Sequence, residues 1–370
     1  MIVVAKIGTS SITDAGGEID RGAIEKLVSE VAALRSSGHR VVVVTSGAVS
    51  AGLPALGLAG SRPADIGTLQ AVSAVGQSRL MRVYDDVLAQ HHLVGGQVLL
   101  APLDFGHRQQ YLHARQTLGR LLELGVVPIV NENDAVADDE LRFGDNDRLA
   151  ALVANLVGAG LLVLVTDTEG LFTADPRIDA SASLIEEVVE FDHQLEARAG
   201  GAGSERGSGG MASKLAAARM AAWSGVRTVI ASARRPGLLP AAVSGEAGIG
   251  TVVRPRDRRL PARKLWIAFA VGSSGTIVVD DGARRAIVQR GTSLLPAGVT
   301  EVRGTFEADA AVEIADVHGQ VFAKGLVRHP SAALASRKGR RTTDLTEEGP
   351  PEVIHRDDLV VLAEAREGTE

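Results

Sequence analysis

The sequence has no cysteine among its 370 residues and few aromatic side chains. The absence of cysteine excludes disulfides, thiolate metal sites and cysteine nucleophiles, and it favours a reducing, cytoplasmic location. Aromatic residues make up 3% of the chain, too few for the platforms on which single-stranded nucleic acids stack. A strong basic excess is missing too: residues 1–250 carry 21 basic and 28 acidic side chains, and residues 251–370 carry 18 and 17. Nucleic acid is therefore not the expected partner.

A hydrophobic run long enough to cross a membrane is also missing. The best candidate, Leu149 to Val165, is at the short limit for a span, contains Asn155, and is broken by glycines at 158 and 160. The first residues, MIVVAKIG, predict a buried strand and not a signal peptide. We therefore expect no membrane association.

Several catalytic signatures are absent as well. The nine histidines are scattered, without HExxH or another metal-ligand spacing, and no serine–histidine–aspartate arrangement stands out. The P-loop pattern GxxxxGK[ST] does not occur either. The histidines thus predict no metal site.

The first 250 residues alternate short β-branched runs with helical patterns. The strand-like runs are IVVAKI, VVVVTSG, GGQVLL, GVVPIVN, LLVLVTD and VRTVIAS. Helical spacing is clearest over RGAIEKLVSEVAALRSSG, which ends at Gly38, and it recurs over 68–90, 109–124, 147–158 and 213–224. This alternation predicts an α/β fold with a mainly parallel sheet covered by helices on both faces. Ligands of such sheets bind at the carboxyl ends of the strands.

The pattern changes near residue 251. RPRDRRLPARK is rich in proline and arginine, which is typical of a solvated connector and also of a nucleic-acid contact. Short strand patterns with Gly, Asp and Pro turns follow it. We therefore predict an α/β domain over 1–254, a linker over 255–274, a small β-rich domain over 275–356 and a polar tail over 357–370.

Two predicted strands end in short polar motifs. Lys6 leaves an apolar strand just before Gly8, Thr9 and Ser10. A lysine in such a strand is costly unless its ammonium meets an anion or reaches solvent at an edge. The run VVVVTSGAVSAG places Ser46 before a helical pattern, where free backbone N–H groups attract anions or a serine simply caps the helix.

Two further motifs are rich in glycine or acidic residues. Six glycines occur from Gly200 to Gly210, and Lys214 follows in a helical pattern, as in a phosphate-binding loop or a surface loop. The stretch VNENDAVADDELRFGDNDRLAAL, Val130 to Leu152, carries seven carboxylates and three carboxamides. A metal cage, a solvated acidic loop and a pocket for a small charged molecule all fit this composition.

Two lysines, glycine-rich turns and an acidic-amide loop at strand ends together indicate phosphoryl transfer. The lack of a convincing catalytic base is informative here. A carboxylate acceptor is already a nucleophile at neutral pH, so the protein has only to align two anions and neutralise their repulsion. Lysines, helix N-termini and Mg²⁺ suit that task.

The motifs AKIGTS, VTSGAVSAG, AVGQSRL, VNENDAV, FGDNDRLAAL, TDTEGLFTADP and GSGGMASK occur in this order. Together they resemble bacterial glutamate 5-kinases of the amino acid kinase family, over nearly the whole chain. The segment RGTSLLPAGVTEVRG is similar to part of a PUA domain. The resemblance implies ATP- and Mg²⁺-dependent phosphorylation of the γ-carboxylate of L-glutamate, inhibition by proline, and a homo-oligomer, a dimer or tetramer, in the cytoplasm.

The resemblance also implies roles for individual residues. Lys6 and Lys214 would stabilise the transferring group, and Asp147 would orient both lysines. Glutamate would be held by Ser46, Asn131, Asp134, Asp145 and Asn146. The nucleotide would be bound by Lys6, Thr166, Asp167, Ser208, Gly209, Gly210, Met211, Ala212, Ser213 and Lys214. The run Asp138, Asp139, Glu140 is expected to be a solvated flap, and Mg²⁺ to be held mainly by ATP and water.

Some positions depart from the family pattern, and other functions remain in competition. His113 stands where an asparagine is expected, Glu205 and Arg206 add charge before GSGGM, and Ala310 replaces an expected glycine. N-acetylglutamate, aspartate and uridylate kinases share the predicted fold. A free ammonium on the substrate favours glutamate, because an acetylated substrate would leave Asp134 without a partner. An RNA-binding PUA protein is the alternative outside this fold class.

Overall fold

The computed structural model divides into two compact units, Met1–Leu260 and Pro261–Glu370, and each is described by itself. The described residues are 1–14, 16–60, 62–105, 108–136, 146–176, 178–179, 181–189, 191, 210–256, 259–340 and 350–362.

The first unit is built on an eight-stranded sheet in the order β3-β4-β2-β1-β5-β7-β8-β6, as far as it is described. The strands are β1 (Ile2–Ile7), β2 (Arg40–Val44), β3 (Gly95–Leu100), β4 (Val127–Glu132), β5 (Leu161–Thr166), β6 (Glu187–Val188), β7 (Arg227–Ser232) and β8 (Thr251–Val253). Pairing from β3 to β7 is parallel throughout, and β8 pairs antiparallel with β7. The predicted mainly parallel sheet is therefore confirmed.

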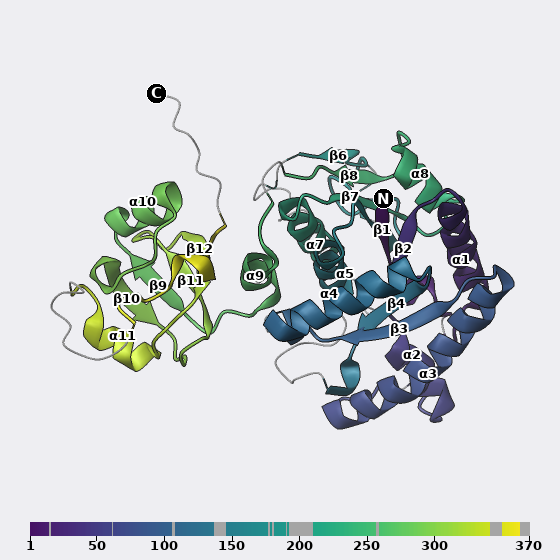
Figure 1. Ribbon diagram of the computed structural model, residues 1–370, viewed down its shortest axis with the longest axis horizontal. Coiled ribbons are helices and arrows are strands. Elements are labelled where there is room, and N and C mark those ends of the chain that lie inside the picture. Colours follow the sequence, from purple (N-terminus) through teal and green to yellow (C-terminus); the bar gives the residue numbers. More distant parts are fainter. Residues whose placement is uncertain are drawn as a thin grey trace. The chain divides into compact units, whose positions relative to one another are not determined.

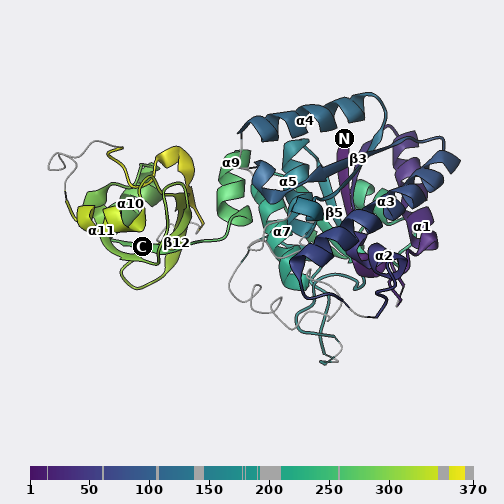
Figure 2. The same cartoon turned by 90° about the horizontal axis from the view of Figure 1, so that it is seen from below.

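Helices cover both faces of this sheet (Figures 1 and 2). They are α1 (Arg21–Ser36), α2 (Ala48–Ala55), α3 (Ile66–Gln90), α4 (Arg108–Glu123), α5 (Asn146–Leu156), α7 (Met211–Trp223) and α8 (Leu238–Ser244). One hydrophobic core contains side chains of α1, α3 and α8. It also contains the odd-numbered residues of β1, which are Val3, Ala5 and Ile7. Side chains alternate along a strand, so Lys6 points to the opposite face, where α5 and α7 pack against each other.

Local signals explain why α1 forms where the sequence predicts it. The side chain of Asp20 accepts a hydrogen bond from the backbone N–H of Ala23 at 3.0 Å and caps the helix. Its buried residues are Ile24, Leu27, Val28, Val31 and Leu34, the stripe read from the sequence. Gly38 follows with a φ of 81°, a left-handed conformation that ends the helix.

The apolar stretch at Leu149–Val165 belongs to this unit. It divides into most of α5, a partly exposed turn and nearly all of β5, and the side chains of the helix and the strand belong mostly to the buried α/β core. No helix in the described part of the chain is long and apolar enough to cross a membrane.

The second unit contains a five-stranded sheet in the order β10-β9-β11-β12-β13. Its strands are β9 (Thr276–Val279), β10 (Val299–Arg303), β11 (Ala311–Ala315), β12 (Val321–Leu326) and β13 (Leu359–Val361). Its helices are α9 (Ala262–Leu265), α10 (Asp281–Arg290) and α11 (Ser331–Arg337), with a π-helical turn over Trp266–Ala270. A separate core around Ile277, Ile314 and Phe322 holds the unit together. The small β-rich domain is thus present.

The ends of this unit differ from the predicted segments. Residues 261–270, placed in the linker by composition, form α9 and the π-helical turn, with Leu265 and Ile267 buried. Residues 359–361, placed in the polar tail, pair with β12 as β13, and Leu359 and Val360 are buried. Charged residues flank both short apolar runs. The average composition of each segment is therefore polar, and it does not predict the buried elements.

Candidate functional site

The predicted site residues gather at one edge of the sheet because their strands are parallel neighbours. Strands β4, β2, β1 and β5 lie side by side in that order. Lys6 lies near the carboxyl end of β1, Ser46 follows β2, Asn131 lies near the end of β4, and Thr166 ends β5. The N-termini of α5 and α7 supply the remaining groups. Side chains distant in sequence therefore meet at the edge where ligands of parallel sheets bind.

A charged triad, Lys6, Asp147 and Lys214, lies between β1, α5 and α7. The Nζ of Lys6 is 2.7 Å from Oδ1 of Asp147, and the Nζ of Lys214 is 3.1 Å from Oδ2. Asp147 is fully buried. Burial disfavours its carboxylate, but the two ammonium groups outweigh that effect and hold the pKa of Asp147 below its usual range. The triad thus holds two ammonium groups around one anion at the strand ends.

An amide cluster, Gln77, Asn131 and Asn146 together with Ser46, lies next to the triad, since Asn146 directly precedes Asp147. The Nδ2 of Asn146 donates to the backbone carbonyl of Thr45, to Oγ of Ser46 and to Oδ1 of Asn131, each at 2.9 Å. The Nδ2 of Asn131 donates to Oε1 of Gln77 at 2.7 Å. All four side chains are buried. The cluster is electrically neutral and offers donors and acceptors without added charge.

Asp134 is the buried carboxylate on the other side of Asn131. Its Oδ2 accepts a hydrogen bond from Oγ of Ser73 on α3 at 2.8 Å. Burial raises the pKa of Asp134, and the Ser73 hydroxyl and the positive charge of Arg62 offset that rise only in part. No salt bridge compensates this carboxylate among the described residues. Asp134 is therefore suited to receive a cationic group from a ligand.

Comparison with known proteins identifies the family of the chain. Residues 1–232 match the amino acid kinase family, and residues 275–348 match the PUA domain. The chain is 47% identical over 364 residues to the glutamate 5-kinase of Moorella thermoacetica, covering 97% of this chain and 96% of that protein. It is 46% identical over 365 residues to the glutamate 5-kinase of Nitrosospira multiformis, covering 97% of each.

The chain belongs to the glutamate 5-kinase branch of the amino acid kinase family. A solved structure of carbamate kinase from Giardia lamblia bound to AMP-PNP matches with a TM-score of 0.50 and 17% identity, covering 69% of this chain and 98% of that one. At that identity the likeness shows the fold alone. The amino acid kinase fold and the C-terminal PUA domain expected from the motifs are both confirmed.

Apart from Lys6 on β1, the described residues expected to bind the kinase's nucleotide lie at the end of β5 and the start of α7. Thr166 Oγ1 donates to Oδ1 of Asp167 at 3.1 Å. Gly210 is the N-cap of α7, and Met211, Ala212, Ser213 and Lys214 form its first turn. Ser213 Oγ lies 3.3 Å from Oδ2 of Asp147, which ties this turn to the triad.

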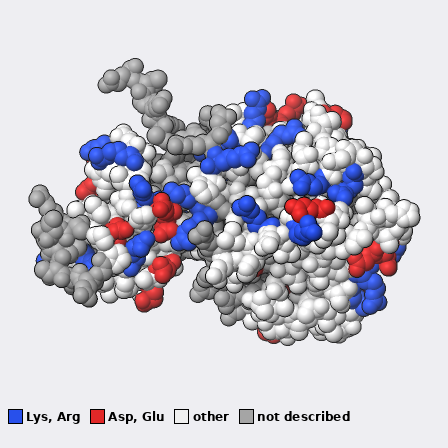
Figure 3. Space-filling view, viewed as in Figure 1, with Lys and Arg blue, Asp and Glu red and all other residues white. Residues whose placement is uncertain are grey.

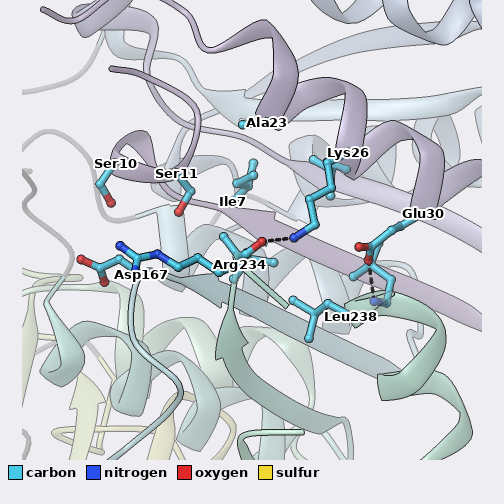
Figure 4. A pocket seen from close by; sticks show the side chains of 13 residues that line it. Ile7, Ser10, Ser11, Ala23, Lys26, Glu30, Asp167, Arg234 and Leu238 are labelled. Atoms are coloured by element: carbon cyan, nitrogen blue, oxygen red, sulfur yellow. Dashed lines mark hydrogen bonds between the residues drawn. The ribbon is translucent and has the colours of Figure 1, made fainter. Parts of the chain in front are cut away.

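Asp167 borders two cavities at this edge. One, of about 260 Å³, lies between β1, α1 and α8, with apolar walls from Ile7 and Leu238 and polar groups from Ser10 and Arg234 (Figure 4). Within it, Lys26 donates to the backbone carbonyl of Ala233. The other, of about 440 Å³, is lined by Asp167, Glu169, Leu184, Ser232, Arg234, Arg235, Gly248, Ile249 and Gly250. Neither cavity is lined by the charged triad or by the amide cluster.

The structure brings most of the predicted site residues of this family member together, and a few lie outside its described part. Lys6, Asp147 and Lys214 meet directly, as do Ser46, Asn131 and Asn146. Asp134 lies beside Asn131 through the short turn that follows β4. Asp145, Ser208 and Gly209 lie outside the described residues, as do Asp138, Asp139 and Glu140 of the predicted flap and Glu205 and Arg206.

Two buried residues of the site, Ser73 and Gln77, were missed by the sequence analysis. Both come from α3, in and just before the motif AVGQSRL; Gln77 contacts Asn131 in β4, and Ser73 contacts Asp134 in the turn that follows β4. A usable signal was present: a serine and a glutamine four residues apart on the apolar face of a helix, among the buried Val72, Gly76 and Leu80. Polar groups on such a face need partners, which is a reason to look for a site.

Other charged groups offer no competing site in the described residues. No group of three or more His, Asp or Glu side chains there is arranged to hold a metal ion. On the face drawn in Figure 3, acidic side chains lie among the basic ones. His113, one of the departures from the family pattern, is exposed on α4, and Ala310 packs partly buried against the core of the second unit.

Proposed function

We propose that this chain transfers the γ-phosphoryl group of ATP to the γ-carboxylate of L-glutamate, giving L-glutamyl 5-phosphate and ADP, the first step of proline biosynthesis. The observation that carries the proposal is a buried, pre-assembled lysine–aspartate–lysine triad whose Asp147 directly follows Asn146 of a neutral amide cluster at the strand ends. The high identity to glutamate 5-kinases over nearly the full chain supports the same activity.

Phosphoryl transfer to a carboxylate needs alignment and charge neutralisation but no proton transfer. An oxygen of the γ-carboxylate forms the new bond to phosphorus while the bond between the γ-phosphorus and its bridging oxygen breaks, and ADP leaves with that electron pair. The ammonium groups of Lys6 and Lys214 are positioned to offset the negative charge on the transferring group. Asp147 fixes both lysines before any ligand arrives, so little reorganisation remains for the transition state.

The amide cluster and Asp134 are the proposed glutamate site. Asp134 receives the α-ammonium, which supplies the positive charge that the buried carboxylate lacks. Ser46, Asn131 and Asn146 line the pocket with neutral groups, which avoid the repulsion that another acidic residue would add. Asp145, beside Asn146 in sequence, is proposed to shape the same pocket.

The nucleotide is proposed to lie along the ends of β1 and β5 and the start of α7. Lys6, Lys214 and the segment 208–213 would contact its phosphates, and Thr166 and Asp167 would contact the nucleoside. A bound Mg²⁺ would supply further charge neutralisation at the phosphates. The described residues fit an ion held mainly by ATP and water, because both oxygens of Asp147 are already occupied by lysines and no acidic cluster lies nearby.

The choice among acceptors in this fold rests on Asp134. N-acetylglutamate has no ammonium, so its binding would leave a buried carboxylate unpaired, which is strongly unfavourable. Aspartate is one methylene shorter and would place its side-chain carboxylate further from the lysines. Free L-glutamate satisfies both ends of the site.

Regulation and assembly follow from family membership as part of the same proposal. Proline is proposed as a feedback inhibitor, the enzyme as a cytoplasmic homo-oligomer, and the second unit as a module that tunes regulation or assembly. A role in RNA binding is not proposed, because residues 251–370 carry 18 basic and 17 acidic side chains, without the basic excess of a nucleic-acid binder.

Trapping of the acyl phosphate tests the reaction directly. The purified chain, ATP, Mg²⁺ and L-glutamate are incubated with hydroxylamine, which converts an acyl phosphate to a hydroxamate. Hydroxamate formation in step with ADP release, and dependent on L-glutamate, is expected. ADP release without hydroxamate would show that the acceptor is not a carboxylate and would overturn the proposal.

A further inference from the structure

Helix α3 brings two polar side chains into the glutamate site from its buried face. Ser73 and Gln77 are one helical turn apart, so they lie on the same side of α3. Ser73 is 4% exposed and Gln77 is 7% exposed. A Cβ added at Gly76 would overlap the carbonyl oxygen of Ala48, so this part of α3 packs directly on the backbone of α2. The two polar groups are thus held in place by tight helix packing.

The orientation of each amide follows from backbone groups whose chemistry is fixed. The N–H of Glu132 can only donate, and it does so to Oδ1 of Asn131 at 2.9 Å. The Nδ2 of Asn131 therefore faces Gln77, whose Oε1 accepts from it. The Nε2 of Gln77 is consequently the end of that amide turned away from Asn131. The carbonyl of Thr45 fixes Asn146 in the same way, with Nδ2 as donor and Oδ1 left over.

Two buried polar atoms remain without a partner in this network. They are Nε2 of Gln77, a donor, and Oδ1 of Asn146, an acceptor. Buried amide groups are nearly always hydrogen-bonded, and leaving them unpaired is costly. The unpaired donor on Gln77 suits a carboxylate, which only accepts hydrogen bonds. The cluster therefore lacks the groups that an amino acid would bring.

We infer that Gln77 is a substrate-binding residue whose Nε2 donates a hydrogen bond to the α-carboxylate of the acceptor amino acid. The α-carboxylate and the α-ammonium share one carbon. The ammonium is assigned to Asp134, which Ser73 holds, and Gln77 is the next residue along the same helix face. The γ-carboxylate, three bonds further on, reaches the lysines. This inference rests on the proposed function and adds the group that selects an α-amino acid.

Replacement of Gln77 by glutamate tests the donor alone. Gln77→Glu keeps the shape and an oxygen for Asn131, but it turns a second oxygen towards the substrate carboxylate. We expect the KM for L-glutamate to rise at least tenfold, while kcat and the KM for ATP change less than about threefold. Gln90→Glu, the same substitution at the exposed end of α3, is the matched control and should change none of these values.

An analogue without the α-carboxylate separates a substrate contact from a structural effect. 4-Aminobutyrate keeps the ammonium and the reacting carboxylate, and its inhibition constant against L-glutamate is measured in both enzymes. We expect this constant to change less than about twofold in Gln77→Glu. An unchanged KM for L-glutamate would overturn the inference. Equal losses of affinity for L-glutamate and for 4-aminobutyrate would overturn it too. A wild-type chain that does not phosphorylate L-glutamate at all would instead overturn the proposed function.

Gln77→Met, neutral and similar in length, is a second variant in case the glutamate variant does not fold.

Discussion

The charged triad and the amide cluster are neighbours, yet they are prepared for ligands in opposite ways. In the triad, each oxygen of Asp147 already contacts a lysine, so the three charges are mutually satisfied before any ligand is present. In the amide cluster, the Nε2 of Gln77 and the Oδ1 of Asn146 have no partner among the described residues. Without a ligand, the charged groups of the triad already have partners, whereas the amide cluster still has two unpaired polar atoms.

This difference corresponds to two different tasks. A group that stabilises a transition state works best when it is already in place, because no free energy is then needed to reorganise it during the reaction. A group that binds a ground state can be left unsatisfied, since a buried unpaired polar group costs about 1–3 kcal/mol and the ligand removes that cost. Changes in the triad should therefore act on kcat, and changes around the amide cluster should act on the KM for glutamate.

The largest effect is expected for Asp147→Asn, which would break the triad. Without the carboxylate, two buried ammonium groups lose their common partner and repel each other. We expect kcat to fall about 10²- to 10³-fold, as when one preorganised group at a developing charge is lost. Steady-state kinetics on the folded variant measure this. Asp86→Asn, which changes an exposed carboxylate on α3, should leave kcat unchanged.

The pH dependence of stability provides a second measurement on the same variant. The pKa of Asp147 is lowered in the folded chain, so its contribution to stability is present above the unfolded pKa of about 4 and is lost as the pH falls through the lower, folded value. The unfolding free energy of the wild type should therefore decline on acidification in a range where that of Asp147→Asn declines less. If the unfolding free energies of the wild type and of Asp147→Asn declined in parallel on acidification, the assigned charge of Asp147 would be contradicted.

Asp134→Asn should separate binding from catalysis. Loss of a hydrogen-bonded charge partner costs about 2 kcal/mol, which corresponds to a roughly thirtyfold rise in the KM for L-glutamate with little change in the KM for ATP. The raised pKa of Asp134 means that its ionised form destabilises the empty protein, and this cost appears as the pH rises through the folded pKa. The variant should thus unfold at the same or a higher temperature at neutral pH. An equal rise in both KM values would argue against an ammonium contact.

Gly76→Ala tests whether α3 must pack tightly to serve the amide cluster. The new Cβ would overlap the Ala48 carbonyl and push α3 away from α2. We expect a loss of about 1–3 kcal/mol in unfolding free energy, together with a higher KM for L-glutamate. Gly119→Ala in α4 is the matched control, because its Cβ meets nothing within 4 Å. That variant should be equally or slightly more stable.

The smallest effect on chemistry is expected from removal of the second unit. All described members of the triad and of the amide cluster lie in Met1–Leu260, which has its own core. A chain ending at 260 should keep kcat within about threefold, since transition-state contacts are retained. Its response to proline or its size in solution should change. Unchanged values for both would remove the proposed regulatory role of that unit.

The sequence predicted the parts of the site that lie at strand ends. Lys6, Ser46, Asn131 and Thr166 follow or end apolar runs, and the parallel arrangement of those runs brings them to one edge. Ser73 and Gln77 lie in the middle of a helix, and their partners are 61 and 54 residues away. The helix pattern shows two polar side chains on a buried face, but their partners depend on the packing of α3 against residues at and just after the end of β4, which are distant in sequence. The antiparallel β8 and the closing strand β13 were missed for the same reason, since each is short and stabilised by distant pairing.

The choice of acceptor tests the central claim most directly. ADP release is measured in one assay with L-glutamate and with N-acetyl-L-glutamate, which differ only at the group assigned to Asp134. A buried carboxylate left unpaired costs several kcal/mol, so we predict that kcat/KM is at least 100-fold higher for L-glutamate, about 2.7 kcal/mol. Equal use of the two substrates, or a preference for the acetylated one, would contradict the account.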